Sequence, residues 1–245
     1  SRGVELSANS LLLIPTFNEA LNIRSLIAGI KLRFPLLQIL VIDDGSSDGT
    51  AEIVNELIIS DSKIALLSRA EKTGLGNAYR AGFAWGMSKD FEYFIEMDAD
   101  HSHRVEDLEK LLEVADKYDL TIGSRWIKGG QINGWAKHRE ILSRFGSRYS
   151  RVVLGLNVHD CTSGFRVFSR RALECINLKD LESNGYGFQV ETLYRAQQAG
   201  LKVGEVPITF IERREGVSKM HGGIVLEAMW NVTKWGFFRL FSKLL

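Results

Sequence analysis

Short apolar runs alternate with amphipathic segments through the first half of the chain. The apolar runs predict five strands: LLLIP from Leu11, ILVIDD from Ile39, IALLS from Ile64, YFIEMDAD from Tyr93 and LTIGSR from Leu120. The segments between them, such as 18–30 and 50–58, repeat their apolar residues at helical spacing. Nearly continuous apolar strands separated by helices are typical of a mostly parallel sheet with helices on both faces. The pattern therefore predicts an α/β fold.

The second half of the chain has a less regular pattern. It contains a glycine-rich loop (126–135), a basic helical stretch (138–155), a turn that includes TSGFR (159–166), a helix near 188–200, two candidate strands (202–207 and 208–213) and a last amphipathic, aromatic helix (222–245). No internal repeat, low-complexity linker or break in composition divides the chain, so we expect a single domain over residues 1–245.

Composition and charge narrow the function classes. Of the 245 residues, 45% are hydrophobic and 25% are charged, which is ordinary for a globular domain. The formal net charge of +1 gives no overall field that would attract nucleic acid, so we expect no nucleic-acid partner. Two cysteines make a disulfide framework improbable and favour a reducing compartment. Because no apolar run approaches the roughly 18 residues of a bilayer crossing, we expect a soluble or peripheral protein that faces the cytoplasm.

Three polar clusters follow directly after predicted strands. They are PTFNE (15–19), DDGSSDGT (43–50) and DADHSH (98–103). In an open parallel sheet, ligands bind at the carboxyl ends of the strands, near a switch in strand order. The three clusters therefore predict one binding site at a common edge of the sheet.

The cluster DADHSH contains two aspartates two residues apart. In an extended segment Asp98 and Asp100 project to the same side, and a shared cation relieves their repulsion. Carboxylate oxygens suit Mg²⁺ or Mn²⁺, which takes its other ligands from water and a diphosphate. An Asx turn that caps a helix starting near Arg104 is the alternative interpretation. Zinc binding through His101 and His103 is disfavoured, because no further His or Cys lies nearby in sequence.

Two further segments have the chemistry of nucleotide binding. Asp44 in DDGSSDGT can accept hydrogen bonds from ribose hydroxyls or a base, although a turn with a helix cap also explains the segment. In KTGLGNAYRAG (72–82), Gly74 and Gly76 precede a helix without the pattern of a P-loop. Glycine there leaves backbone N–H groups open to an anion, so Gly74 is a candidate substrate-binding residue. Neither segment identifies a ligand by itself.

The order of these motifs resembles that of family 2 glycosyltransferases, which have the GT-A fold. Eight segments between Leu11 and Lys219 carry the resemblance: PTFNEALNI, VIDDGSSDGT, GLGNAYRAG, MDADHSH, GSR at Gly123, W-x-x-x-R from Trp135 to Arg139, TSGFR at Thr162 and R-x-x-G-x-S-K from Arg213 to Lys219. Within that family the pattern is most similar to polyprenol (dolichol) phosphate mannose synthases. The resemblance implies a Rossmann-like, mostly parallel GT-A sheet, with a nucleotide-sugar-binding half (1–122) and an acceptor- and membrane-facing half (123–245).

The resemblance also implies the donor and metal sites. The nucleoside end of GDP-mannose would contact Pro15, Phe17, Glu19, Ile42 and Asp44. Asp98 and Asp100 would hold Mg²⁺ or Mn²⁺ on the diphosphate, and the backbone of Ala99 would lie near the donor. Ser102 stands at the position of a third metal-site group, where some members have Gln, so water could fill that coordination site. Phe17 stands where Tyr is usual, which removes a hydroxyl contact and keeps the ring.

A polyprenyl phosphate is the acceptor that the resemblance implies. Four cations match family residues that meet the donor diphosphate and the acceptor phosphate: Arg125, Arg139, Arg213 and Lys219. Such cations and a metal offset the repulsion between an anionic nucleophile and an anionic leaving group. We therefore assign catalytic roles to Asp100, Arg125, Arg213 and Lys219. The acceptor phosphate is already ionised near pH 7, so no general base is assigned. Direct displacement would invert the anomeric centre.

Structural roles and other functions stay open at this point. Arg125 could form a cation–π pair with Trp126, and Arg213 could form surface ion pairs. A glucosyltransferase that uses UDP-glucose and the same kind of lipid would have similar motifs. A catalytically inactive nucleotide-sugar-binding scaffold is disfavoured by the presence of Asp98, Asp100, Arg213 and Lys219.

A lipid substrate requires a membrane-facing surface. Five cations gather in or beside the basic helical stretch, three of them at helical spacing: Lys137, Arg139, Arg144, Arg148 and Arg151. They would attract anionic headgroups by about 1 kcal/mol each, and a solvated helix face is the alternative. The last stretch places aromatic and apolar residues away from Glu227, Asn231 and Lys234, as in a helix of the membrane interface. It would equally suit the core, a transmembrane partner or a fused membrane domain. We expect a peripheral protein on the cytoplasmic face of a membrane.

Overall fold

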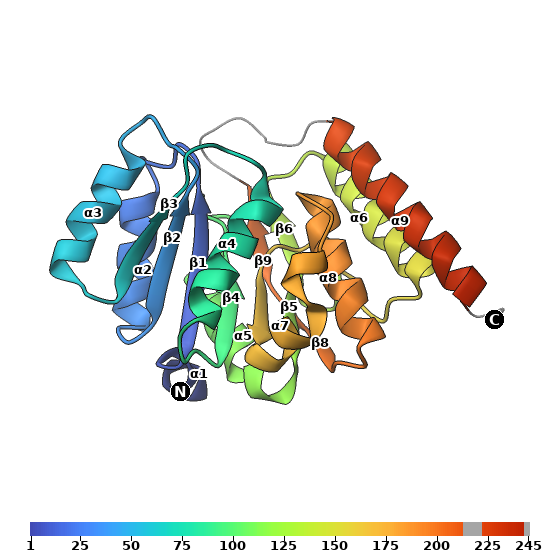
Figure 1. Ribbon diagram of the computed structural model, residues 1–245, viewed down its shortest axis with the longest axis horizontal. Coiled ribbons are helices and arrows are strands. Elements are labelled where there is room, and N and C mark those ends of the chain that lie inside the picture. The colour runs from blue at the N-terminus through green and yellow to red at the C-terminus, as the bar shows by residue number, and fades with distance from the viewer. Residues whose placement is uncertain (213–221, 243–245) are drawn as a thin grey trace.

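In the part of the chain that the structure describes, seven strands form one mixed sheet at the centre of the molecule (Figure 1). The computed structural model describes residues 1–212 and 222–242. The strands of this sheet are β1 (Ser10–Thr16), β2 (Gln38–Asp43), β3 (Ile64–Ser68), β4 (Tyr93–Glu96), β5 (Leu120–Ser124), β7 (Arg166–Ser169) and β8 (Val203–Pro207). Their order is β3-β2-β1-β4-β7-β5-β8. Only β7 runs antiparallel to its neighbours, so the sheet is mostly parallel, as predicted.

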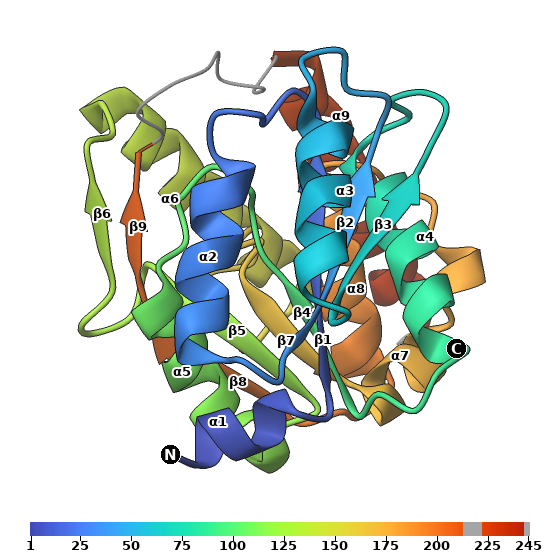
Figure 2. The same cartoon turned by 90° about the vertical axis from the view of Figure 1, so that its left-hand side faces the viewer.

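Helices cover both faces of this sheet. In chain order they are α1 (Arg2–Ser7), α2 (Ile23–Arg33), α3 (Thr50–Ser60), α4 (Leu75–Met87), α5 (Val105–Glu113), α6 (Lys137–Leu154), α7 (Arg170–Ile176), α8 (Tyr186–Gln198) and α9 (Gly222–Ser242). Helices α2, α3 and α5 lie on one face, and α4, α7 and α8 lie on the other (Figures 1 and 2). The predicted α/β class with helices on both faces is confirmed.

The alternation of side chains along β1 builds a core on each face. Leu12 and Ile14 point into the cluster formed with α2, α3 and α5, whereas Leu11 and Leu13 point into the cluster formed with α4, α7 and α8. Helix α4 lies unusually close to the sheet at Gly82. A Cβ atom there would stand 2.4 Å from Leu13 Cδ2, so a larger residue would push the helix away. Both faces of the inner parallel strands β1 and β2 are therefore buried, which explains their nearly continuous apolar sequences.

Five strands match the apolar runs of the sequence, but two short strands were not predicted. The predicted turn at 159–166 is wrong at its end, because Arg166 begins β7. This strand has only four residues, and its charged first residue is fully buried, which hides the apolar pattern. The predicted loop at 126–135 contains β6 (Gln131–Asn133), which pairs with β9 (Thr209–Ile211) outside the main sheet. Strand β6 is short and partly exposed, so its sequence has no strand signal.

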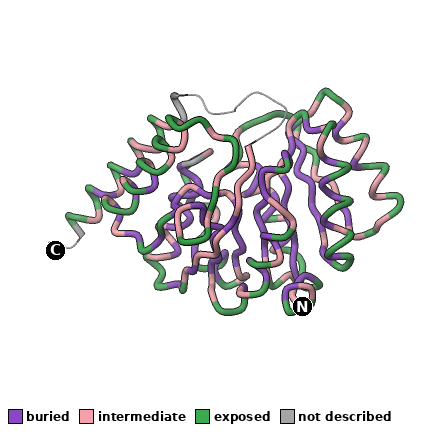
Figure 3. Tube along the Cα trace, turned by 180° about the vertical axis from the view of Figure 1, so that it is seen from behind, coloured by how far each residue is buried: buried purple, intermediate pink, exposed green. Residues whose placement is uncertain are grey.

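Helices α6 and α9 lie side by side at one end of the molecule (Figure 1). They approach closely where Gly236 meets Val153, since a Cβ on Gly236 would stand 2.3 Å from Val153 Cγ1. On its inner side α9 stacks Trp235 on Tyr194 of α8, and its outer side is exposed (Figure 3). The last helix therefore packs on the domain, which is one of the predicted roles, and it also presents an exposed face. None of the described helices has both the length and the apolarity that a bilayer crossing requires.

Candidate active site

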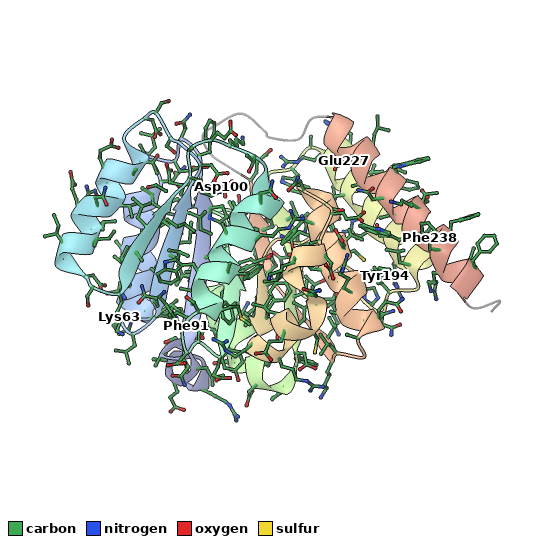
Figure 4. The ribbon with its side chains drawn as sticks, in the orientation of Figure 1. Lys63, Phe91, Asp100, Tyr194, Glu227 and Phe238 are labelled. Carbon is green, nitrogen blue, oxygen red and sulfur yellow. The ribbon has the colours of Figure 1, made fainter. Side chains whose placement is uncertain are left out.

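A cavity of about 720 Å³ opens at the carboxyl ends of the parallel strands. Figure 4 shows Asp100 at this edge of the sheet, whereas Lys63 and Phe91, which precede β3 and β4, lie at the opposite edge. The segments that follow β1, β2, β4 and β5 all contribute to the cavity. The three polar clusters therefore lie at one edge, as their positions after strands predicted.

Most of the predicted site residues line this cavity: Pro15, Phe17, Glu19, Asp44, Gly74, Asp98, Ala99, Asp100, Ser102, Arg125 and Arg139. Ile42 is an exception, because its side chain is fully buried in β2 and packs against α4 at Gly82. Arg213 and Lys219 lie outside the described residues. Several cavity residues were not assigned to the site from the sequence, although Lys72, His103, Trp135 and Thr162 belong to the quoted motifs. The residues without an assignment are Lys72, His103, Trp135, Thr162, Asn184, Gln189 and Phe210.

Hydrogen bonds connect the loop after β1 with the loop after β2. Asp43 accepts bonds from the Thr16 hydroxyl (2.7 Å) and from the amide and hydroxyl of Ser46 (3.0 and 2.6 Å). The Glu19 amide donates to the hydroxyl of Thr50 (3.0 Å) at the start of α3. These two loops carry the predicted nucleoside contacts, so the bonds between them hold that part of the cavity in one shape.

Asp44 lies against a cation at this end of the cavity. Arg69 Nη1 donates to Asp44 Oδ1 at 2.9 Å. Burial raises the pKa of Asp44 above its usual value, and Arg69 counteracts this rise. Beside it, the ammonium of Lys72 lies 4.5 Å from the ring centroid of Phe17, within the range of a cation–π contact. An aromatic ring, a cation and a carboxylate therefore surround the space expected for the nucleoside.

The DADHSH segment forms a turn that places its two histidines in different environments. The Ser102 amide donates to Asp100 Oδ1 (3.0 Å), so an Asx turn is present. It does not cap α5 as the alternative interpretation supposed, because α5 begins at Val105 and has no side-chain cap bond. The Asp98 amide donates to Nδ1 of His103 (3.1 Å), and His103 stacks on Phe165. Burial lowers the pKa of His103, which keeps the ring neutral and able to accept this bond. His101 is exposed and bonds to the Ser25 hydroxyl (2.9 Å). His103 therefore holds the backbone of Asp98 in place by accepting a hydrogen bond from its amide.

The donor set of this turn fits a hard divalent cation. Asp98, Asp100 and Ser102 all line the cavity and present oxygen atoms of the type that Mg²⁺ and Mn²⁺ prefer. Within residues 1–212 and 222–242, no three His, Cys, Asp or Glu side chains gather as a complete metal site. A cation of this kind takes its remaining oxygens from a diphosphate and water.

Arg125 is held in a buried ion pair at the wall of the cavity. Its Nε and Nη2 donate to the two carboxylate oxygens of Asp160 (2.7 and 2.8 Å), and its amide donates to the same carboxylate (2.9 Å). Asp160 is 0% exposed and Arg125 is 6% exposed. The guanidinium also lies 5.2 Å from the ring centroid of Trp126. The expected cation–π contact is therefore present in a side chain that also faces the cavity.

Aromatic rings line the same wall around a second cation. The guanidinium of Arg139 lies 4.3 Å from the ring centroid of Trp135 and pairs with Glu212 (3.3 Å). Phe210 on β9 packs edge-on against Trp135. Two cations within an aromatic wall make this end of the cavity suitable for an anion attached to an apolar group.

Comparison with known proteins identifies the family. A model of glycosyl transferase family 2 matches residues 12–176, which is more than half of the chain. The chain belongs to glycosyl transferase family 2. One relative is the polyprenol monophosphomannose synthase of Mycolicibacterium smegmatis, with 43% identity over 95% of this chain and 89% of the relative. Another is the undecaprenyl-phosphate mannosyltransferase of Micrococcus luteus, with 44% identity over 92% of this chain and 93% of the relative.

Solved structures of low sequence identity show the fold. Glucosyl-3-phosphoglycerate synthase from Mycobacterium tuberculosis in complex with phosphoglyceric acid aligns with a TM-score of 0.70 and 20% identity, over 95% of this chain and 84% of that one. The same enzyme with Mn²⁺, UDP-glucose and phosphoglyceric acid aligns with a TM-score of 0.69, 20% identity and the same coverage. The GT-A fold expected from the family motifs is confirmed, and a structural relative of this family 2 chain is solved with Mn²⁺.

Proposed function

We propose that this chain transfers mannose from GDP-mannose to a polyprenyl phosphate and forms polyprenyl-phosphate mannose. The observation that carries the proposal is the 43% and 44% identity, over nearly the whole chain, with two proteins named as mannosyl-transferring enzymes of polyprenyl lipids. The chain acts as a single catalytic unit. Residues 1–122 bind the nucleotide sugar, and residues 123–245 face the acceptor and the membrane.

The groups around the cavity have different tasks in this reaction. The nucleoside lies between the loop 15–19 and Asp44, and Gly74 leaves space for the donor's phosphates. Asp98 and Asp100, with Ser102 beside them, hold Mg²⁺ or Mn²⁺. When bound, the metal neutralises negative charge on the diphosphate leaving group.

Cations that line the same cavity receive the acceptor. Arg125, held in place by Asp160, and Arg139 attract the acceptor phosphate and stabilise charge in the transition state. Arg213 and Lys219 are proposed as further cations of the same reaction. The acceptor oxygen is already ionised at neutral pH, so no general base is needed. A single displacement inverts the anomeric carbon and gives a β-linked product from an α-linked donor.

A smaller apolar pocket offers a path for the lipid chain. Its volume is about 70 Å³, and it lies between α6, α8 and α9. Trp135 and Thr162 line both this pocket and the large cavity. A lipid whose phosphate lies near Arg125 can therefore place its first isoprene units in the small pocket.

The outer face of α6 and α9 is the proposed membrane surface. On α6, Arg144, Arg148 and Arg151 are exposed beside apolar side chains such as Phe145. On α9 the outward residues include Trp230 (71% exposed), and Phe238 points away from the body of the molecule (Figure 4). Cations beside exposed aromatic residues are typical of helices that lie in a membrane interface. We propose peripheral binding at the cytoplasmic face of a membrane, and a transmembrane partner would fit the same surface.

One assay tests the activity. Purified protein is incubated with a short polyprenyl phosphate and either labelled GDP-mannose or labelled UDP-glucose, with and without EDTA. We expect a labelled lipid from GDP-mannose, and we expect EDTA to abolish it and added Mg²⁺ or Mn²⁺ to restore it. A product from UDP-glucose alone would change the donor assignment. The absence of a lipid product from both donors would refute the enzymatic function.

A further inference from the structure

Gln189 of α8 is a buried side chain of the cavity that the mechanism above does not use. It is 2% exposed and lines the cavity. Its Nε2 donates to Oε2 of Glu96 (2.8 Å), the last residue of β4. Its backbone carbonyl accepts bonds from Arg166 Nη1 (2.7 Å) and from the hydroxyl of Thr192 (3.1 Å). Backbone and side chain are therefore both fixed, and the direction of the carboxamide follows from the bond that its N–H group donates to the carboxyl oxygen of Glu96.

The other end of this carboxamide has an unused hydrogen-bonding atom. Over residues 1–212 and 222–242, no hydrogen-bond donor reaches Gln189 Oε1, although the atom is buried. A buried acceptor without a partner is costly, and natural proteins leave few of them. Because the side chain lines the cavity, a bound molecule is the natural source of the missing donor.

The position of Gln189 indicates which part of the donor it meets. Gly164 lies between Gln189 and the metal-site aspartates. A Cβ on Gly164 would stand 3.7 Å from Gln189 Nε2 and 4.0 Å from Asp98 Oδ1. A diphosphate held at Asp98 has the hexose attached to its outer phosphate, so the hexose lies next to this carboxylate. A carbonyl oxygen repels phosphate oxygens and accepts a hydrogen bond from a hydroxyl group, and the hexose carries hydroxyl groups.

We propose that Gln189 is a specificity-determining residue that accepts a hydrogen bond from one hydroxyl group of the transferred hexose. The assignment rests on the proposed function, because it requires a nucleotide sugar in the cavity. It adds a sugar contact to a site whose other residues meet the nucleoside, the phosphates and the metal.

A cycle of substrate and residue changes tests the assignment. The donors are GDP-mannose and its 2-, 3-, 4- and 6-deoxy analogues, and the proteins are wild type, Gln189→Met and Gln198→Met. Gln198 is an exposed glutamine at the end of the same helix and is the matched control. Both kcat/KM and the equilibrium binding of each donor are measured. The binding series needs no transfer, so it tests Gln189 even where the mannosyltransferase assay of the wild type gives no product.

For wild type and Gln198→Met we expect kcat/KM and affinity to be about 10-fold or more lower for one deoxy donor than for GDP-mannose. The reason is that Gln189 Oε1 is then left buried without a hydrogen-bond donor. For Gln189→Met, kcat/KM and affinity for the same deoxy donor should be less than about 2-fold lower than for GDP-mannose, since the carboxamide that would accept the bond is already absent. The affinity for GDP alone should be equal in the three proteins. Equal penalties in wild type and Gln189→Met for every analogue would refute the proposal. An effect of Gln189→Met confined to the KM of the polyprenyl phosphate would also refute it and would assign Gln189 to the acceptor.

Discussion

The buried pair of Arg125 and Asp160 allows the structural and catalytic roles of an arginine to be separated. Asp160 is 0% exposed and receives three hydrogen bonds from Arg125. Removal of one member of a buried pair leaves an uncompensated charge and costs about 3–5 kcal/mol. We therefore expect Asp160→Leu and Arg125→Met each to lower the free energy of unfolding by that amount. In a chain of this size the loss corresponds to a fall in Tm of roughly 6–20 °C.

The double variant Arg125→Met/Asp160→Leu makes the distinction. Replacement of a whole buried ion pair by apolar residues is often neutral, so its free energy of unfolding should return to within about 1 kcal/mol of wild type. Mannose transfer should stay lower by roughly 100-fold or more, because the cation near the acceptor phosphate is missing. Thermal unfolding and transfer of labelled mannose are measured on the same preparations. Arg24→Ala is the control, since Arg24 pairs with Glu56 at an exposed site and should cost less than about 1 kcal/mol.

Two results would contradict this reasoning. If the double variant transferred mannose at the wild-type rate, Arg125 would have a structural role only. If Asp160→Leu unfolded at the same temperature as wild type, the ion pair would not contribute the stability that its burial implies. Loss of stability and activity in all three variants would mean that the apolar replacements do not pack at this position.

Three further predictions concern the metal site, a buried carboxyl group and the membrane surface. Asp100→Ala should reduce transfer by roughly 100-fold or more, because metal stabilisation is worth several kcal/mol, and Mn²⁺ titration should show weaker binding; unchanged activity would remove Asp100 from the metal site. Burial raises the pKa of Glu96 from 4.5 to about 7, so its contribution to stability is present below pH 4.5 and is lost as the pH rises through about 7. The free energy of unfolding of wild type should therefore fall by about 3 kcal/mol relative to that of Glu96→Gln between pH 4.5 and pH 7.5. Denaturant unfolding that gives the same difference between the two proteins at both pH values would contradict this. Arg144→Glu/Arg148→Glu/Arg151→Glu should reduce binding to anionic vesicles by on the order of 100-fold at about 1 kcal/mol per cation; equal pelleting of both proteins would exclude α6 from the membrane contact.

The sequence predicts best where one physical requirement dominates a segment. Strands β1, β2, β4 and β5 were predicted because strands buried on both faces need nearly continuous apolar residues. The edge strand β3 is only partly buried, but its run IALLS is also apolar. Strand β7 was missed because its central position in the sheet depends on Arg166, whose charge is compensated by the carbonyls of Cys161, Ser163 and Gln189. Ser163 and Cys161 lie only three and five residues before Arg166, and Gln189 lies on α8. Because all three partners are backbone carbonyls, which every residue has, they leave no signal in the sequence.

In the candidate site, too, features set by local sequence could be predicted and features set by tertiary contacts could not. The aspartates at 98 and 100 could be predicted because they follow a strand directly, whereas the functions of their neighbours depend on tertiary contacts. His101 and His103 are two residues apart in sequence, yet one is exposed beside Ser25 and the other is buried against Phe165. Gln189 belongs to an amphipathic helix and shows no pattern that would separate it from a surface residue. Its role depends on its distance from Glu96 in the folded chain.

The edge strand β8 has a consequence for any shortened form of the protein. The family model ends at residue 176, after β7 and α7, and β8 lies beyond it. Strand β8 pairs with β5 along five residues, from Leu120 with Val203 to Ser124 with Pro207. A fragment cut at residue 176 would leave the N–H and C=O groups of β5 open to other chains, and such an edge promotes aggregation. Pro207 at the end of β8 offers no N–H to a further strand, so β8 protects the sheet from self-association.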